Sequence, residues 1–219
     1  MTLPAKADYQ RFIEPVVRAE PLALLTAEGF SGRALTFTRT VDGIRQEVRF
    51  ALQVRPTYAK DSAQLILRTH ITVPEQVQAI YRDLVPQDPD PSASCTIAAP
   101  IESIARERVG MWLFKDPESA AGLEKPITRA ISHSVVPYMR ETATAAGLFA
   151  MIRDDQAAEN PAAALLAPDL PPGNRPALGV ALALSIGDHP AATTLAEHAY
   201  GNAPFRTQYD ALFRYMAKA

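Results

Sequence analysis

The residues best suited to hold a charged partner are basic side chains that share one side of two predicted strands. Arg45, Arg49 and Arg55 have the same parity in one run, and Arg68 and His70 lie on the corresponding side of the next. Alternate residues of a strand face the same way. A guanidinium offers forked donors that match carboxylate and phosphate groups. The pattern therefore predicts a docking surface, unless cross-strand ion pairs or the C-terminal helices occupy this face.

Charge and composition favour a protein over a nucleic acid as the occupant of that surface. Glu47 interrupts the arginines, and 22 Lys and Arg against 24 Asp and Glu give a net charge of −2. No run of aromatic residues lies among the arginines to stack on bases. We therefore expect a protein partner, whose identity the sequence leaves open together with the oligomeric state.

The chain contains no recognisable catalytic motif. Neither glycine-rich nucleotide motif occurs, nor a nucleophile elbow, nor an H-E-x-x-H pair. The hydroxyls of Ser132 and Ser134 flank His133, but neighbours on a helix point about 100° apart and cannot share one site. These features favour a non-enzymatic protein without a cofactor. The alternative is a small-ligand protein or enzyme with a pocket between sheet and helices, using His70 or His133 with a nearby carboxylate.

The histidines and the single cysteine do not follow a metal-ligand pattern. The histidines are too far apart in sequence to share one face of a helix at a spacing of three or four; they are His70, His133, His189 and His198. Cys95 cannot form an internal disulfide, which agrees with a reducing compartment, and we expect it to be buried and structural. The sequence therefore predicts no metal site.

The clearest local structure is a β-hairpin over residues 34–54. Asp42 and Gly43 are predicted to form a two-residue turn of type I′. Such a turn requires positive φ at both positions, and these two residue types tolerate it. In the resulting register one side of the ribbon is apolar and pairs Leu35 with Phe50, Phe37 with Val48 and Val41 with Ile44. Arg39 opposite Gln46 is the single break in that side. Because this pair is close to the turn, we expect both side chains to reach solvent.

The other predicted elements complete an α+β domain with helices on one face of an antiparallel sheet. A third strand over 63–73 leads into a helix to about residue 84, and two further strands cover 95–101 and 109–114, although 101–108 is also compatible with a helical turn. A helix over 8–27 contains Pro15 and Pro21, so it should be kinked or divided. A helix begins at the N-cap Asp116 and is predicted to run to about residue 146, unless Pro126 or Pro137 breaks it.

A helical region follows the predicted α+β domain. We expect the domain over 1–148, an alanine- and proline-rich linker or loop over 149–176, and a helical C-terminal region over 177–219. The last part divides into helices over 178–187, 191–200 and 205–218, separated by two turns that contain Gly and Pro. Whether these helices pack on the sheet or form a separate unit is open.

Overall composition excludes several classes of protein. The chain has 219 residues, of which 47% are hydrophobic and 21% charged, values typical of a globular protein. No apolar run approaches the roughly 18 residues that a membrane-spanning helix needs. The first residues lack the pattern of a signal peptide. We therefore expect a cytoplasmic protein without a membrane-spanning segment.

Several short motifs resemble those of a known family. Glu28-Gly29-Phe30, Phe37-Thr38-Arg39, Trp112 and Pro137-Tyr138-Met139 occur in an order that resembles the DUF4304 family of uncharacterised bacterial proteins, over residues of about 10–142. The chain departs from that family in its single tryptophan and its long C-terminal extension. The resemblance implies no catalytic residues. Some members look like immunity or interaction proteins, which implies a bacterial protein of that type.

A second, shorter resemblance lies near the C-terminus. Residues 178–199, with Gly187 and Asp188 between two helical segments, are similar to one tetratricopeptide helical pair. No second copy is visible at a period of about 34 residues. The pattern therefore predicts a helical hairpin that packs on another element or on a partner.

Overall fold

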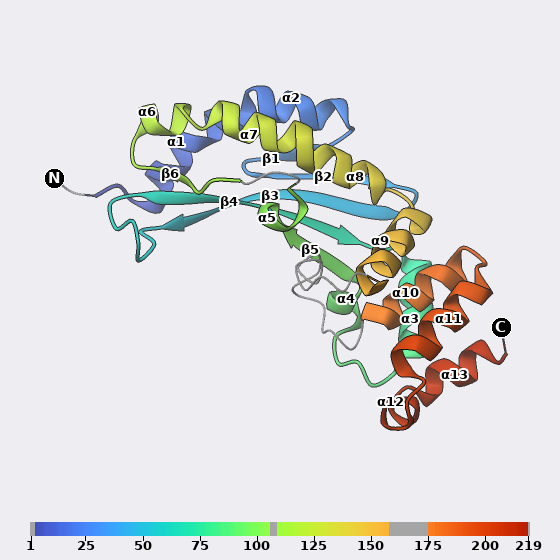
Figure 1. Ribbon diagram of the computed structural model, residues 1–219. Coiled ribbons are helices and arrows are strands. Elements are labelled where there is room, and N and C mark those ends of the chain that lie inside the picture. Colours follow the sequence, from blue (N-terminus) through green and yellow to red (C-terminus); the bar gives the residue numbers. More distant parts are fainter. Residues whose placement is uncertain (1–2, 106–108, 158–174, 219) are drawn as a thin grey trace. The chain divides into compact units, whose positions relative to one another are not determined.

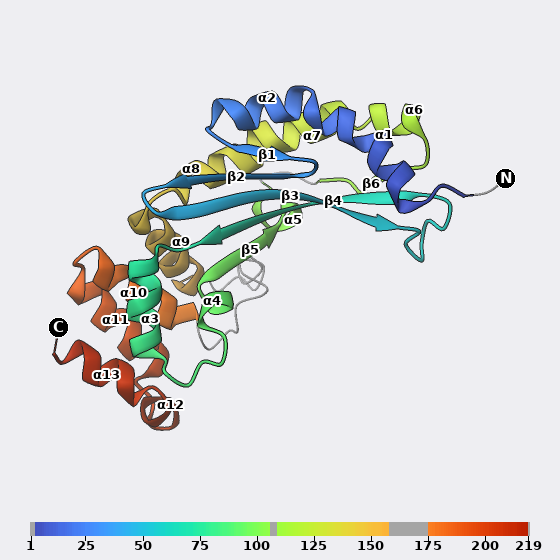
Figure 2. The ribbon, with the colours of Figure 1, turned by 180° about the vertical axis from the view of Figure 1, so that it is seen from behind.

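The computed structural model describes residues 3–105, 109–157 and 175–218. These residues form helices and one six-stranded antiparallel sheet (Figures 1 and 2). The predicted α+β class with a helical C-terminal region is therefore confirmed.

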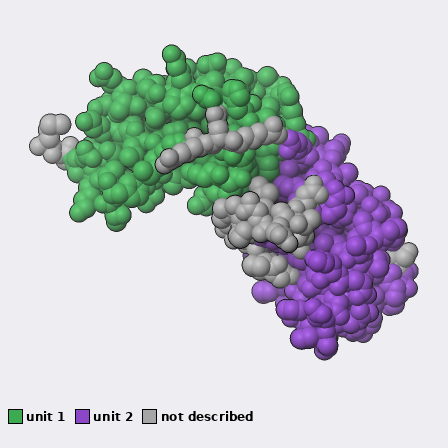
Figure 3. Space-filling model, in the orientation of Figure 1, with its two compact units in different colours: residues 1–39, 46–70, 99–140 green, residues 40–45, 71–98, 141–219 purple. Residues whose placement is uncertain are grey.

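Contacts divide the chain into two compact units, and each unit is assembled from segments that are separate in sequence (Figure 3). Unit 1 comprises residues 1–39, 46–70 and 99–140, and unit 2 comprises residues 40–45, 71–98 and 141–219. The boundary near residue 148 stays a prediction. The predicted linker begins within helix α9 (Ala145–Ala157), and its residues 158–174 lie outside the described part of the chain.

The sheet has the strand order β1-β2-β3-β4-β5, and β6 also pairs with β4. The strands are β1 (Ser31–Arg33), β2 (Thr36–Val41), β3 (Ile44–Val54), β4 (Ala63–Thr72), β5 (Thr96–Pro100) and β6 (Trp112–Phe114). Because β3 lies along one edge of β4, strands β5 and β6 share its other edge. Strand β6 is shorter than the predicted 109–114.

The hairpin of β2 and β3 has the predicted turn and register. Asp42 and Gly43 have φ angles of 49° and 77°, as a type I′ turn requires. Phe50 N donates a hydrogen bond of 2.8 Å to Leu35 O. The apolar side chains of this face are buried except for Val41, which is half-buried, and Phe37 is fully enclosed. Alternation of period two was therefore enough to orient these strands.

Strand β1 was not predicted. It pairs with β2 in antiparallel register, with Arg33 opposite Thr36 and Ser31 opposite Thr38. The strand has three residues, all of them exposed, so it shows no alternation of apolar and polar side chains. A strand of this kind gives no periodic signal in a sequence.

The helices of unit 1 lie over the apolar face of its part of the sheet (Figures 1 and 2). They are α1 (Lys6–Arg18), α2 (Glu20–Ala27), α5 (Ile101–Ile104), α6 (Pro117–Ala121), α7 (Glu124–Ala130), the π-helical turn η1 (Ile131–Val135) and α8 (Val136–Glu141). The predicted helix over 8–27 is divided, with Pro21 in the first turn of α2 and Pro15 inside α1. Tyr9 of α1 packs edge-on against Phe114 of β6, with 5.8 Å between ring centroids.

The expectation of one helix from residue 117 to about 146 is wrong. The segment is interrupted after α6, passes through the π-turn η1, and stops again after α8. In η1, Val136 N donates to Ile131 O, five residues back. Pro137 has no N–H, and its ring would collide with the carbonyl four residues earlier in a regular helix. The wider turn just before Pro137 accommodates this proline.

Unit 2 is built around helix α10, which packs against α11, α9 and α3. Its helices are α3 (Glu75–Leu84), α4 (Pro91–Ser94), α9 (Ala145–Ala157), α10 (Arg175–Ser185), α11 (His189–Tyr200), α12 (Ala203–Gln208) and α13 (Asp210–Met216). The predicted hairpin of α10 and α11 is present: Gly187 has a φ of 78°, and Asp188 caps α11 by accepting from Ala191 N at 3.0 Å. The predicted last helix is two helices, because the backbone leaves helical geometry at Tyr209.

Candidate functional site

The predicted docking residues lie on the face of the sheet opposite the buried side chains, but they belong to different units. Arg49, Arg68 and His70 lie in unit 1, whereas Arg45 is an exposed residue of unit 2. Arg55 follows the last residue of β3 with a φ of 53°, and its Nη2 donates to Pro4 O at 3.2 Å. The candidate site therefore consists of the unit 1 residues of strands β3 and β4.

The register of β3 and β4 places two arginines directly opposite each other. Arg55 N donates to Ser62 O at 2.9 Å, and the carboxylate of Glu47 lies 3.7 Å from His70 Nδ1. Both contacts fit a single antiparallel register, in which Arg49 is opposite Arg68. We refer to these two residues as the arginine pair. The sequence predicted that they share a face, but not that they are direct neighbours.

Glu47 is the acidic residue beside the arginine pair. Its carboxylate lies 2.6 Å from Nη2 of Arg49, and its side chain is only 12% exposed. The Arg49 side chain is 51% exposed, so its guanidinium is held at one end and open at the other. The Arg68 side chain is exposed and makes no hydrogen bond or ion pair with the residues that the structure describes.

Opposed like charges favour an anion on this surface. Like charges directly across a strand pair are destabilising, by roughly 0.2–1 kcal/mol. A carboxylate has two oxygens and about four acceptor positions, so one such group can accept from both guanidinium groups. The arginine pair can therefore bind an anion of a partner without a rearrangement of the backbone.

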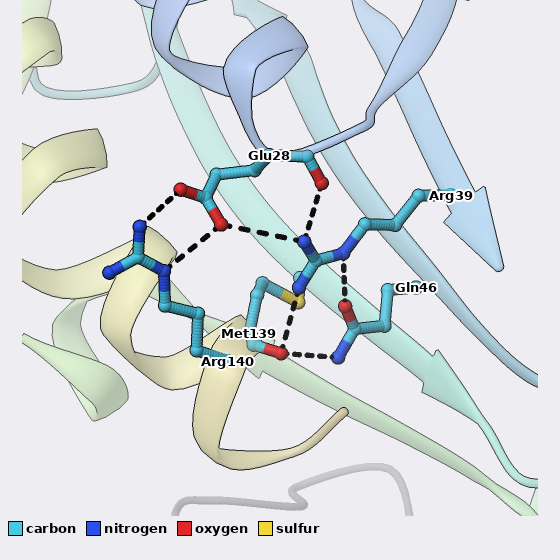
Figure 4. A network of polar contacts seen from close by, with 5 residues as sticks. All are labelled: Glu28, Arg39, Gln46, Met139 and Arg140. Atoms are coloured by element: carbon cyan, nitrogen blue, oxygen red, sulfur yellow. Dashed lines mark hydrogen bonds and ion pairs between the residues drawn. The ribbon is translucent and has the colours of Figure 1, made fainter. Parts of the chain in front are cut away.

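A second polar cluster was missed by sequence reasoning: Arg39 and Gln46 are buried rather than solvated. Gln46 is 0% exposed, and the Arg39 side chain is 9% exposed. They lie on the apolar face, as their parity requires, but helices cover that face as far as this position (Figure 4). The expectation that proximity to the turn would expose them is wrong, because it took no account of the helix layer.

Arg39 joins the ends of two helices to the sheet. Its Nη1 donates to Glu28 O at 2.6 Å, just after the end of α2, and its Nη2 donates to Met139 O at 3.0 Å, in the last turn of α8. The last carbonyls of a helix have no partner within the helix and carry partial negative charge. The guanidinium of Arg39 lies between the C-terminal ends of α2 and α8. It donates hydrogen bonds to a carbonyl at each end and is stabilised by both helix dipoles.

Gln46 and the ring of Phe30 complete the surroundings of Arg39. Gln46 accepts from Arg39 Nε at 2.7 Å and donates to the same Met139 O at 2.7 Å. The guanidinium carbon of Arg39 lies 4.7 Å from the centre of the Phe30 ring, within the range of a cation–π contact. All the donor nitrogens of this guanidinium are therefore engaged by protein groups.

Glu28 supplies the countercharge for this cluster. Arg140 binds its carboxylate with Nε at 3.0 Å and also with Nη2, and Arg39 Nη1 lies 3.6 Å from the same carboxylate (Figure 4). The hydrogen bonds from Arg140 are the main reason that the pKa of Glu28 lies below its ordinary value. Each nitrogen of the buried Arg39 guanidinium is directed at a group of this chain, so we interpret the cluster as structural.

The remaining candidates of the sequence analysis lie apart from the arginine pair. His133 is exposed, and its Nδ1 lies 3.1 Å from Arg129 O. Cys95 is fully buried in unit 2, and burial raises the pKa of its thiol to about 12. Among the described residues, no three His, Cys, Asp or Glu side chains are grouped so that they could hold a metal ion.

Two of the surface hollows are lined entirely by described residues. One, of about 150 Å³, lies in unit 1 beside Trp112, Arg129 and Ser134; the other, of about 410 Å³, lies in unit 2 beside Gln78 and Arg82. Neither is lined by a histidine. They therefore give no direct support to the alternative of a histidine-based active site.

The chain matches no protein-family model, no curated protein and no solved structure. Membership of the DUF4304 family stays a prediction. None of the described helices is sufficiently long and apolar to cross a lipid bilayer.

Proposed function

We propose that this protein is a non-enzymatic interaction protein that binds a partner protein through the arginine pair on the open face of its sheet. The observation that supports it is the direct opposition of Arg49 and Arg68, both exposed, with Glu47 orienting the first. An immunity-type role in a bacterial cytoplasm agrees with the resemblance to the DUF4304 family and belongs to the same proposal.

The open face also accounts for the choice of an interaction protein over an enzyme. His70 has a carboxylate neighbour in Glu47, but the two side chains are on a sheet face and are not among the lining residues of either described hollow. Catalysis usually requires a concave site in which reactive groups converge. A flat, charged surface is better suited to docking.

Cross-linking tests this function in the cells that produce the protein. A photoreactive residue in place of Gln64, on the same face of β4, should capture a specific protein. The double substitution Arg49→Glu and Arg68→Glu should abolish capture by reversing two charges. Arg11→Glu is a matched control, because Arg11 is an exposed arginine of α1, its side chain 79% exposed.

Two results would reject the proposal. One is an unchanged cross-linked product in the double variant, with the fold intact by circular dichroism. The other is turnover of a small molecule that disappears when His70 is replaced by Gln, which would support an enzyme.

A further inference from the structure

A third arginine stands in line with the arginine pair across the sheet. Arg33 of β1 is opposite Thr36 of β2. The hairpin register, fixed by the bond from Phe50 N to Leu35 O, places Thr36 opposite Arg49. Arg68 follows on β4. One transverse line therefore contains three arginines on the open face, interrupted only by a threonine.

The two outer arginines of this line are available for a ligand. Arg33 and Arg68 are exposed, and neither side chain makes a hydrogen bond or ion pair within the part of the chain that the structure describes. Arg49 is half exposed and oriented by Glu47. Separate strands hold the three backbone positions, so their spacing is set before any ligand binds.

We propose that Arg33, Arg49 and Arg68, the arginine row, bind an acidic peptide segment of the partner through two carboxylates. This inference rests on the proposed function and assigns a role to Arg33, which the sequence analysis did not single out. The arginine pair holds one carboxylate, and Arg33 holds the second.

Charge identifies the occupant as an acidic peptide rather than a nucleic acid. Three arginines and the carboxylate of Glu47 together have a formal charge of +2. Two carboxylates balance that charge, whereas a phosphate backbone needs a longer basic track. Glu47 would also repel closely spaced phosphates.

Strand spacing predicts how far apart the two carboxylates are. Neighbouring strands lie about 4.8 Å apart, so Arg33 is roughly 10 Å from Arg49 and 14 Å from Arg68. A carboxylate held midway between Arg49 and Arg68 is therefore about 12 Å from Arg33, measured across the strands. In an extended peptide, residues four apart point to one side and lie about 13 Å apart. The preferred ligand is thus an extended segment with acidic residues at positions i and i+4.

Titration with short peptides tests the row. The probes are a serine-based peptide with two glutamates four residues apart, the same peptide with one glutamate, and a version with glutamine at both positions. Binding to the ¹⁵N-labelled full chain is followed by NMR at low salt. We expect the two-glutamate peptide to bind about tenfold more tightly than the one-glutamate peptide, and the glutamine peptide not to bind.

Variants then separate the roles within the row. Arg33→Gln should remove the tenfold advantage of the second glutamate and leave the one-glutamate peptide unaffected. Arg49→Gln or Arg68→Gln should weaken both peptides about tenfold. Arg33→Lys, which keeps the charge, should restore part of the advantage, and Arg11→Gln should change nothing.

Three results would overturn the inference. They are no dependence on the glutamates, equal effects of Arg33→Gln on both peptides, and tighter binding of oligothymidylate or inorganic phosphate with the same dependence on the arginines. If these occur while cross-linking at Gln64 still depends on Arg49 and Arg68, the proposed function survives and only the peptide specificity is wrong. If the peptides behave as expected but no cellular protein is captured, peptide binding by the arginine row is supported and the proposed function as an interaction protein is rejected.

Discussion

At the scale of single residues, the most consequential side chain is the buried guanidinium of Arg39. Removing a charge from water is costly unless other groups replace its hydrogen bonds. Two helix-end carbonyls, Gln46 and the carboxylate of Glu28 supply those groups. A shortened side chain would leave several of these partners buried and unpaired, which costs more than the loss of one surface ion pair.

We predict that Arg39→Gln lowers the free energy of unfolding by about 3–5 kcal/mol, the range for breaking a buried ion pair by removal of one partner. Urea denaturation monitored by circular dichroism measures this change.

Arg140→Gln is the matched control, because Arg140 also binds Glu28 but its side chain is 66% exposed. It should cost much less than Arg39→Gln, because an ion pair of an exposed side chain is screened by solvent. Equal losses for the two variants would show that Arg39 does not have the structural role assigned to it.

A second prediction concerns the thiol of Cys95. Because burial raises its pKa to about 12, the thiolate fraction at neutral pH is very small. The folded protein should therefore react with a thiol reagent only as fast as it opens, and fully only in denaturant. Rapid reaction without denaturant would contradict the burial of this residue.

Sequence reasoning identified Arg49 and Arg68 but not the position of Arg39 or the role of Arg33. The first two follow from alternation within a strand, which is a local property. The burial of Arg39 depends on a helix end 100 residues later in the chain. Arg33 is placed by a three-residue strand that has no periodic pattern. Neither position could be predicted, because strand pairing and the packing of helices on the sheet join segments that are distant in sequence and leave no pattern within the segment itself.

At the scale of elements, strands were easier to predict than helix boundaries. Strand β4 alternates in burial along its whole length, β3 does so from Ile44 to Phe50 except at Glu47, and the Asp42-Gly43 turn fixes the register of β2 and β3. The helical segment after Asp116 shows apolar residues at helical spacing throughout, yet it breaks after α8. A new helix start contributes to this break: Gly147 N donates to Thr144 Oγ1 at 3.0 Å, near the first residue of α9.

The close approach at the start of α9 leads to a third prediction. A Cβ on Gly147 would lie 2.0 Å from Glu141 O, a backbone atom. Alanine is the better helix former by about 1 kcal/mol, but overpacking costs about 1–3 kcal/mol. Gly147→Ala should therefore lower the melting temperature.

Gly122→Ala is the control, because we expect it not to lower the stability of the protein. A Cβ there would meet its nearest atom, Ser119 O, at an ordinary 3.5 Å, and φ is −61°. This variant should be neutral or more stable by about 0.4–1 kcal/mol. If both alanines raise the melting temperature, the tight connection between α8 and α9 does not exist.

At the scale of the whole molecule, several carboxyl groups make the fold sensitive to acid. The pKa values of Glu28, Asp90 and Asp116 are lowered, mainly by side-chain hydrogen bonds from Arg140, Ser92 and Ser119 respectively. A carboxyl with a lowered pKa stabilises the folded state above its unfolded pKa. That stabilisation is lost as the pH falls through the folded value.

The fourth prediction is that unfolding free energy declines as the pH falls below the ordinary glutamate value of 4.5. Urea titrations at about pH 6 and pH 3.5 measure the difference. Glu28→Gln should reduce it, because glutamine does not titrate. Stability that rises toward acid pH, or an unchanged slope in Glu28→Gln, would be inconsistent with the assigned ion pairs.

The buried cluster around Arg39 has a consequence for how the protein is made. Glu28 is 112 residues from Arg140 and Arg39 is 100 residues from Met139, so the guanidinium cannot find its final acceptors until about two thirds of the chain has left the ribosome. Until then the apolar side of the β2–β3 hairpin is not fully covered. We expect nascent chains shorter than about 140 residues to be substrates for chaperones, and release from them to coincide with the emergence of helix α8.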